Sequence, residues 1–390
     1  MNILLLAPQP FFEVRGTPLA VLALARALTG LGHRVDLLSF PQGEDVALPG
    51  LRQLRSLKLP FVGRVRAGAS LAKLVLDVPF MLEAWTRMAL GGYDVVHAVE
   101  EAAHLTAPLA RLLALPLVMD VDSSIPDQLR YSGFARRGPL PWVAERLAAY
   151  ALAHSAAVVT VCTSLTNGVR AKAPLARVFQ IEDPPLVEPG SAAPAESVAA
   201  LRSSLGLGPA PVVLYSGNFE AYQGVGLLVE AAARVPEAQF LFMGGEPPEI
   251  EELRAKAAAT SSRCFFSGKR PPCELPAFLA LADVLVSPRT QGENTPFKVY
   301  TYLASGKPLV ATRIPTHTQL VDDTLAFLVE PTALGISDGV KQALTRPEEA
   351  RTRAALGRAL IEREYSTARY EEKVARAYAL LARELESRRA

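Results

Sequence analysis

Short runs of apolar residues alternate with amphipathic stretches along almost the whole chain. The first apolar run, Asn2 to Ala7, has the continuous pattern of a buried strand. A helical pattern follows from Pro18 to Leu31, with Thr17 as its expected N-cap and Gly32 as its stop. Further strands are predicted at residues 35–39, 94–97, 117–120 and 158–162. Strand–helix–strand repetition of this kind predicts a parallel sheet with helices on both faces.

The rhythm breaks at Glu188 to Ser197, a stretch rich in Pro, Gly, Ala and Ser that is typical of a linker. The alternation then restarts, with strands predicted at residues 212–215, 239–243, 265–266, 284–287 and 308–311 and helices at 225–235, 276–282 and 298–303. We therefore expect an α/β protein with two doubly wound, Rossmann-like domains, residues 1–188 and 198–366. Residues 367–390 form a long, charged amphipathic helix at the C-terminus.

The bulk composition narrows the class of protein. The chain has 390 residues, enough for two domains at roughly 150 residues each. A net charge of +2 gives no reason to expect nucleic acid as a partner. The three cysteines lack metal-ligand spacing, which argues against structural zinc or a disulfide framework and fits a cytoplasmic protein. The apolar N-terminal run indicates a strand rather than a signal peptide, and no apolar window reaches the roughly 18 residues of a membrane span.

One stretch of the first half departs from the alternation. Residues 51–76 contain no acid and six basic residues, Arg52, Arg55, Lys58, Arg64, Arg66 and Lys73. The apolar segment Leu74 to Trp85 overlaps its end. A basic amphipathic region can lie on an anionic membrane surface, which would place residues 51–90 at the inner face of the cell membrane. A solvated helix face beside a core helix explains the same pattern.

Ligands of open parallel sheets bind beyond the carboxyl ends of the strands, where backbone N–H groups at helix N-termini favour anions. Three junctions qualify. At residues 14–18, Gly16 allows close backbone approach and Thr17 caps the helix; at residues 216–224, Gly217, Asn218 and Gln223 form a polar turn. An ordinary capped helix and an ordinary Gly/Asn turn explain these two junctions equally well.

The third junction, residues 288–312, combines a polar turn with two cations. Gly292, Asn294 and Thr295 form the turn, Arg289 stands at the strand end, and Lys298 lies on the first turn of the helix. Two cations around exposed backbone donors suit a diphosphate. Neither a dinucleotide G-x-G-x-x-G nor a P-loop motif is present, so NAD enzymes and P-loop enzymes are not favoured.

Eight segments in a fixed order resemble one enzyme family. They are residues 15–39, 93–98, 115–124, 212–232, 240–245, 265–269, 281–289 and 295–312 (TPFKVYTYLASGKPLVAT). This series resembles the retaining nucleotide-sugar glycosyltransferases of family 4, which have the two-domain GT-B fold with a central cleft. The resemblance implies transfer of a sugar from a UDP- or GDP-linked donor to an acceptor hydroxyl with retention. It further implies that no metal or other cofactor is needed, because protein cations and helix ends stabilise the leaving diphosphate.

The resemblance also assigns site residues. The donor would lie between the domains, with its sugar near Gly16 and the turn from Glu293 to Pro296, and its base against the backbone around Gly268 and Lys269. The terminal helix would cross back to the first domain. The implied substrate-binding residues are Gly16, Thr17, Gly217, Asn218, Gln223, Gly244, Gly268, Lys269, Arg289, Asn294, Thr295, Pro296, Lys298 and Thr301, and the implied catalytic residues are Asp122 and Glu293.

Several positions depart from the family pattern. Relatives carry an arginine and a lysine on the diphosphate where this chain has Asn218 and Gln223, and a ribose-binding glutamate where it has Thr301. We expect Arg289 and Lys298 to supply the missing positive charge, and the Thr301 hydroxyl to face the ribose. The slot of a common histidine falls on Asp122, which either orients a hydroxyl or caps a helix.

Other functions remain open at this point. A nucleotide-sugar 2-epimerase would need more acids and histidines in the cleft than this chain offers, and a sugar phosphorylase would need a lysine-bound pyridoxal phosphate and a longer chain. A degenerate GT-B scaffold that partners an active transferase would explain the altered positions. The basic stretch favours a lipid-linked glycan as acceptor, as in surface polysaccharide assembly, although a soluble acceptor fits as well.

Overall fold

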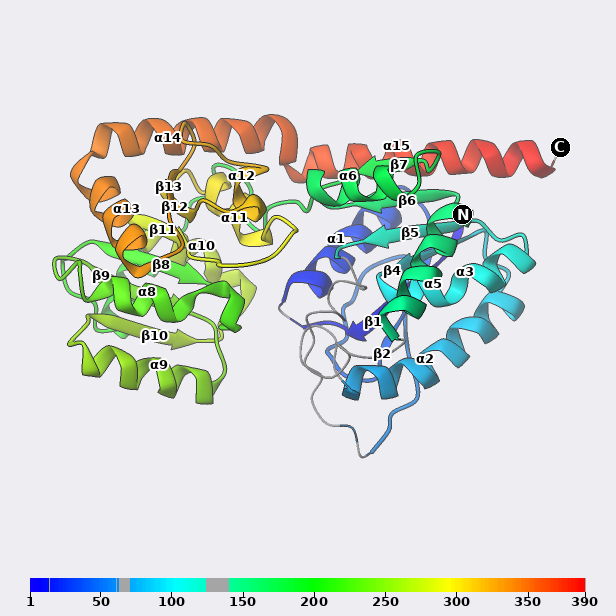
Figure 1. Ribbon diagram of the computed structural model, residues 1–390, viewed down its shortest axis with the longest axis horizontal. Helices are drawn as coiled ribbons and strands as arrows, with labels where there is room; N and C mark the ends of the chain where they lie inside the picture. The colour runs from blue at the N-terminus through cyan, green and yellow to red at the C-terminus, as the bar shows by residue number, and fades with distance from the viewer. Residues whose placement is uncertain (14, 61, 63–70, 124–139, 390) are drawn as a thin grey trace. The chain divides into compact units, whose positions relative to one another are not determined.

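The computed structural model describes residues 1–13, 15–60, 62, 71–123 and 140–389 (Figure 1). The chain divides into two compact units. Unit 1 comprises Met1–Glu182 and Tyr370–Ala390, and unit 2 comprises Asp183–Arg369. Each unit is built around one parallel sheet, with seven strands in unit 1 and six in unit 2. The doubly wound α/β prediction is therefore confirmed.

The sheet of unit 1 has the strand order β3-β2-β1-β4-β5-β6-β7. Its strands are β1 (Asn2–Pro10), β2 (Arg34–Phe40), β3 (Leu51–Arg55), β4 (Val95–Val99), β5 (Leu117–Val121), β6 (Ala157–Thr160) and β7 (Val178–Gln180). The order reverses between β1 and β4, which makes their carboxyl ends the switch point of this sheet. The sequence predicts that the basic stretch either lies on a membrane or forms a solvated helix face. Its first residues instead form the edge strand β3, which pairs with β2.

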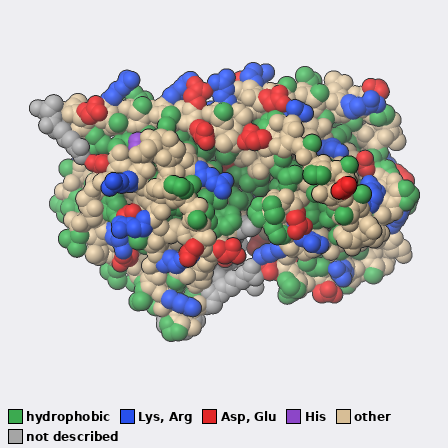
Figure 2. All heavy atoms as spheres, turned by 180° about the vertical axis from the view of Figure 1, so that it is seen from behind, with side chains coloured by type: hydrophobic (Ala, Val, Ile, Leu, Met, Phe, Trp, Pro, Cys, Tyr) green, Lys and Arg blue, Asp and Glu red, His purple; other side chains and the backbone are tan. Residues whose placement is uncertain are grey.

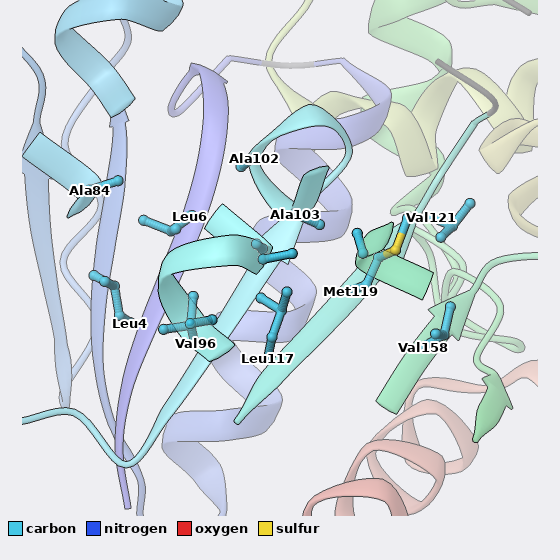
Figure 3. Packing of buried hydrophobic residues seen from close by; sticks show 14 of the residues in the cluster. Leu4, Leu6, Ala84, Val96, Ala102, Ala103, Leu117, Met119, Val121 and Val158 are labelled. Carbon is cyan, nitrogen blue, oxygen red and sulfur yellow. The ribbon is translucent and has the colours of Figure 1, made fainter. Parts of the chain in front are cut away.

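Helices cover both faces of this sheet. They are α1 (Gly16–Gly30), α2 (Leu71–Leu90), α3 (Glu101–Leu112), α5 (Leu140–His154), α6 (Thr163–Lys172) and α15 (Thr367–Arg389). One apolar cluster joins Leu4, Leu6 and Val96 of the strands to Ala84 of α2 and Ala102 of α3 (Figure 3). The opposite face packs against α1 and α15. Burial on both faces explains why the strands have continuous apolar runs rather than an alternating pattern.

The C-terminal helix α15 packs on unit 1, as the resemblance implies. Tyr370, Val374 and Leu381 lie in the same buried cluster as α1. The Tyr378 hydroxyl lies 2.7 Å from Nδ1 of the fully buried His97 on β4. A polar anchor and an apolar face together fix the last helix onto the sheet of the first unit.

The sheet of unit 2 has the order β10-β9-β8-β11-β12-β13 and reverses between β8 and β11. Its strands are β8 (Val212–Ser216), β9 (Gln239–Met243), β10 (Cys264–Gly268), β11 (Val284–Ser287), β12 (Leu309–Thr312) and β13 (Phe327–Val329). Its helices are α7 (Ala195–Ser204), η1 (Ala221–Gln223), α8 (Val225–Ala232), α9 (Pro247–Ala259), η2 (Pro272–Glu274), α10 (Leu275–Leu281), α11 (Phe297–Ala304), α12 (Pro315–Thr318), α13 (Ala333–Thr345), α14 (Pro347–Leu360) and η3 (Ile361–Tyr365). Helix α7 begins inside the stretch predicted as a linker.

On the face shown in Figure 2, Lys and Arg side chains are intermixed with Asp and Glu, with apolar patches between them. This mixture agrees with the small net charge of +2. Within the described ranges, no helix is long and apolar enough to cross a membrane.

Candidate functional site

Three glycines bring the ends of β8, β9 and β10 into close contact. Gly217 donates its N–H to the Met243 carbonyl at 2.9 Å, and Gly244 donates to the Gly268 carbonyl at 2.8 Å. Gly217 and Gly244 have φ values of +142° and +120°. A Cβ added to Gly244 would lie 1.9 Å from the Gly217 carbonyl oxygen, so only glycine fits there. The structure thus brings these three predicted binding residues together at one edge of the sheet.

Two buried tyrosines hold the loop after β8, and the sequence analysis missed both. The Tyr215 hydroxyl donates to the Asn218 carbonyl at 2.6 Å. The Tyr302 hydroxyl oxygen accepts from the Ser216 N–H at 2.7 Å. Burial raises the pKa of Tyr302 to about 12, so this hydroxyl stays protonated. The predicted binding residue Asn218 is therefore positioned through its backbone, by a ring that looks like an ordinary core residue in the sequence.

The amino group of Lys298 lies at the switch point of unit 2. Its Nζ is 3.1 Å from Oε1 of the buried Gln223 and 3.9 Å from the centroid of the Tyr215 ring. A Cβ added to Gly217 would lie 2.6 Å from the same Nζ. Burial, and then the positive charge of Arg289, hold the pKa of Lys298 well below its usual range. No carboxylate in the described part of the chain pairs with this lysine.

Arg289 organises the turn that follows β11. Its guanidinium donates to the Gln291 carbonyl at 2.7 Å, and to the carbonyl and side-chain oxygen of Asn294 at 3.2 and 3.1 Å. It also lies 5.1 Å from the ring centroid of Tyr222. A Cβ added to Gly292 would lie 2.3 Å from the guanidinium. Arg289 is 8% exposed, and among the described residues it has no carboxylate partner. It therefore shapes the turn while adding an unpaired positive charge.

The rest of the turn leads to the N-terminus of α11. The Glu293 side chain is exposed, and its carbonyl accepts from Gln319 Nε2 at 2.8 Å. Thr295 is buried, and Pro296 is the N-cap residue of α11 with extended backbone. Because the first N–H groups of a helix have no partner within the helix, this end of α11 presents donors suited to an anion.

Two predicted binding residues have partners within unit 2. Thr301 is 1% exposed, and its hydroxyl oxygen accepts from the Leu186 N–H at 3.0 Å. Contact with a ribose would require this hydroxyl to turn away from Leu186. Lys269 is exposed, and its side chain forms an ion pair with Glu246, the N-cap residue of α9.

His317, on α12, links the ends of β11 and β12. Its Nε2 lies 2.8 Å from the Ser287 hydroxyl, and its Nδ1 lies 2.8 Å from the Thr312 carbonyl. The Thr312 hydroxyl donates to the Arg289 carbonyl at 2.5 Å. Burial lowers the pKa of His317 to about 4, so the ring is neutral at pH 7. This network fixes the backbone from which the Arg289 side chain extends.

In unit 1 the structure corrects one prediction. Helix α1 begins at Gly16, and its N-cap residue is Arg15, with extended backbone and no side-chain cap. Thr17 lies in the first turn and is not the N-cap, because the chain turns into the helix two residues earlier than the Thr-Pro pattern predicts. An added Cβ on Gly16 would meet no atom within 4 Å, so the backbone there is open to approach.

Asp122 follows β5 directly and is 9% exposed. The alternative that it caps a helix concerns residues outside the described ranges. The next residue, Ser123, donates its hydroxyl to Glu100 Oε1 at 2.8 Å. Asp120, two residues earlier, places Oδ2 3.1 Å from His97 Nε2. Polar side chains therefore gather at the carboxyl ends of β4 and β5, as the position of the switch point predicts.

Two parallel sheets, each of which reverses its strand order, define a two-domain α/β protein. Among the described residues, Lys298 and Arg289 lie without a carboxylate partner near the switch point of unit 2. Family comparisons agree with this class. Residues 15–182 match the family model described as glycosyl transferase 4-like domain, and residues 210–346 match the model described as glycosyl transferases group 1. The chain belongs to the GT-B glycosyltransferases.

Curated relatives and solved structures show the same likeness. The chain is 27% identical to alpha-D-kanosaminyltransferase from Streptomyces kanamyceticus, over 85% of this chain and 90% of that protein. It is 25% identical to phosphatidyl-myo-inositol mannosyltransferase from Mycobacterium leprae, over 83% and 81%. Sucrose-phosphate synthase from Thermosynechococcus elongatus has the same fold, with a TM-score of 0.78, 21% identity, and coverage of 98% and 99%. HepE from Anabaena matches with a TM-score of 0.73, 17% identity, and coverage of 97% and 99%.

Proposed function

We propose that this glycosyltransferase moves a sugar from a UDP- or GDP-linked donor to an acceptor hydroxyl with retention of configuration, and that unit 2 holds the donor diphosphate. One observation carries this proposal. Lys298 and Arg289 lie close together at the switch point of unit 2 without a carboxylate partner among the described residues. Two desolvated cations beside a helix N-terminus are costly in the free protein and favourable once an anion binds.

The same geometry supports a role in the chemical step. Negative charge develops on the diphosphate as the bond to the sugar breaks, and donors already in place stabilise it without rearranging. Lys298 and the first N–H groups of α11 would act on this charge. Gly217 and Gly244 would let the donor approach the backbone. The absence of side chains at both glycines gives that approach room.

Retention is expected to follow front-face attack, in which a leaving phosphate oxygen takes the acceptor proton. This step needs neither a protein nucleophile nor a metal. Glu293 would hold sugar hydroxyls, and Asp122 would orient the acceptor or a sugar hydroxyl. The comparisons supply support from related proteins: HepE from Anabaena has been solved with UDP and with UDP-glucose.

The test is calorimetric titration of UDP, GDP and ADP into the wild type and Lys298→Met. Binding of one nucleotide that weakens in the variant supports the transferase proposal and names the donor class. A degenerate scaffold would bind none of the three. An epimerase would convert the nucleotide-sugar without any acceptor. Retention is read from the anomeric configuration of the product by NMR.

We further propose that unit 1 contacts the cytoplasmic face of the membrane through residues 51–90 and that the acceptor is lipid-linked. Helix α2 exposes Leu74, Val78 and Leu82 at four-residue spacing, at 39, 62 and 58%. Trp85 continues this apolar stripe at 39%. An apolar helix face in a segment of the chain that is rich in basic residues favours the surface of an anionic bilayer. The basic residues Arg64 and Arg66 lie outside the described residues.

A further inference from the structure

An acidic cluster in unit 1 lies at the carboxyl end of β4, beside the switch point of that sheet. Lys73 and Asp77 stand one turn apart on α2, while Glu100 and Glu101 begin α3. Lys73 Nζ lies 2.6 Å from Glu101 Oε1 and 3.5 Å from Glu100 Oε2. We call these four residues the acidic cluster. Two carboxylates thus contact one ammonium group, and Asp77 adds a third carboxylate one helical turn from Lys73.

Two oxygens of the cluster have no hydrogen-bond donor among the described residues, although Lys73 and the Ser123 hydroxyl contact the cluster. Asp77 is 8% exposed, and its Oδ1 is buried and accepts no hydrogen bond. Oε2 of Glu101 is buried and unbonded in the same way. Burial, and then the charge of Glu101, raise the pKa of Asp77 to about 8. His104 adds no positive charge at pH 7, because burial lowers its pKa to about 4.

Glu100 is held in a costly backbone conformation at this site. Its φ and ψ are +51° and −126°, which non-glycine residues rarely adopt. Its N–H donates to the Asp120 carbonyl at 2.9 Å, and its carboxylate accepts from the Ser123 hydroxyl at 2.8 Å. Such conformations persist where the surrounding structure fixes them, and they are common at binding sites. This backbone conformation places a carboxylate at the edge of the sheet where Asp122 follows β5.

We propose that the acidic cluster binds a primary ammonium group on the acceptor, so that the acceptor is an amino sugar or aminocyclitol. This inference rests on the proposed transferase function. An ammonium donates three hydrogen bonds, which suits buried carboxylate oxygens that have none. The amine is either on a free sugar or on a lipid-linked one.

The first test compares paired probes. Glucosamine and 2-deoxystreptamine carry amines, while glucose and myo-inositol are their neutral counterparts. Binding of each to the wild type is measured by calorimetry, and acceptor use by release of nucleoside diphosphate. We expect the amines to bind about tenfold more tightly than the neutral probes, the gain of one charged hydrogen bond. Equal binding of amine and neutral probes would overturn the inference.

Variants of the cluster separate binding from folding. Asp77→Asn is expected to lose the amine preference, while Asp338→Asn, an exposed aspartate on α13, keeps it. Lys73→Met removes the competing ammonium, so amine probes should bind this variant more tightly and raise its melting temperature. An amine preference that survives Asp77→Asn, together with no gain in Lys73→Met, contradicts the proposal.

Two further arms keep the outcomes distinct. Binding of UDP and GDP reports on unit 2, so a wild-type protein that binds neither nucleotide would overturn the proposed function. A protein that binds nucleotide but shows no preference for amines would overturn only this inference. Vesicles that carry a glucosaminyl lipid are compared with free glucosamine. Faster turnover with the lipid assigns a membrane acceptor, and faster turnover with the free sugar assigns a soluble one; either supports the ammonium site.

Discussion

Replacing Lys298 by methionine should weaken diphosphate binding and, at the same time, leave the ligand-free protein at least as stable. Methionine keeps an apolar side chain of similar length and removes the ammonium, whose Nζ lies 3.1 Å from Gln223 Oε1 and 3.9 Å from the centroid of the Tyr215 ring. A lowered pKa means that folding disfavours the charged form of Lys298. The lysine therefore costs stability in the free protein, and this cost is offset only when an anion binds.

The size of the binding loss follows from the contacts. A hydrogen bond to a charged group contributes about 1.5–3 kcal/mol. Since 1.4 kcal/mol corresponds to a factor of ten, the dissociation constant should rise about 10- to 150-fold. Arg289 should not compensate, because the turn at Gln291 and Asn294 already uses three of its N–H groups.

The pH dependence gives a second signature. In the proposed function, diphosphate would bind the protonated form of Lys298 and so raise the pKa of this lysine. The affinity for nucleoside diphosphate should be highest below the pKa that Lys298 has in the ligand-free protein. Above that pKa it should fall about tenfold per pH unit, until the higher pKa of Lys298 in the complex is reached. Lys298→Met should remove this fall.

Calorimetry across pH provides the assay, with Lys256→Ala as the control because Lys256 forms a surface ion pair with Glu230 on α8. The reasoning about Lys298 is refuted if Lys298→Met binds the same nucleotide with wild-type affinity. A clear drop in the melting temperature of the ligand-free variant would also contradict it, since a structural lysine would behave that way.

Three further predictions follow from the same structure. Gly244→Ala should lower the free energy of unfolding by at least about 2 kcal/mol in a denaturant titration, because the new Cβ would lie 1.9 Å from a carbonyl oxygen. In the control Gly168→Ala, the new Cβ meets no atom within 4 Å, so this variant should be neutral or stabilising. Equal effects of the two substitutions would contradict this prediction. His317 stays neutral down to about pH 4 in the folded protein but takes up a proton near pH 6.5 in the unfolded chain. The free energy of unfolding should therefore fall by about 3 kcal/mol as the pH drops from 6.5 to 4. His317→Gln should flatten this fall, and an unchanged slope in the variant would argue against the role of His317. The double variant Val78→Ser, Leu82→Ser should reduce co-sedimentation with anionic vesicles. Its melting temperature should be unchanged, because both side chains are more than half exposed. Unchanged co-sedimentation would contradict the membrane proposal.

Periodic features of the sequence were sufficient to predict the architecture. Strands buried on both faces have continuous apolar runs, and their alternation with helices predicted both parallel sheets. The switch-point rule then indicated candidate loops at the strand ends, and the structure brings Gly217, Gly244 and Gly268 together there. Their role in binding stays a prediction. The fold prediction succeeded because strand and helix formation depends on local spacing, and topology determines where the carboxyl ends of the strands meet.

Contacts between residues far apart in sequence could not be predicted in this way. The Thr301 hydroxyl accepts from Leu186, 115 positions away, and no local pattern signals that pairing. Arg289 binds its own turn, which depends on loop backbone geometry that periodicity does not reveal. The acidic cluster joins α2 to α3, so Asp77 looked like an isolated charge in an apolar segment. The edge strand β3 lies in the basic stretch, where charged residues hide its strand pattern.

Release of nucleoside diphosphate from UDP-, GDP- and ADP-linked sugars tests the central proposal most directly. The wild type is incubated with each donor, with and without amine and neutral acceptors, beside Lys298→Met and Lys256→Ala. We predict slow release from one donor class, faster release when an acceptor is present, and loss of both in Lys298→Met alone. No release and no binding with any of the three donors would contradict the account and favour a non-catalytic scaffold.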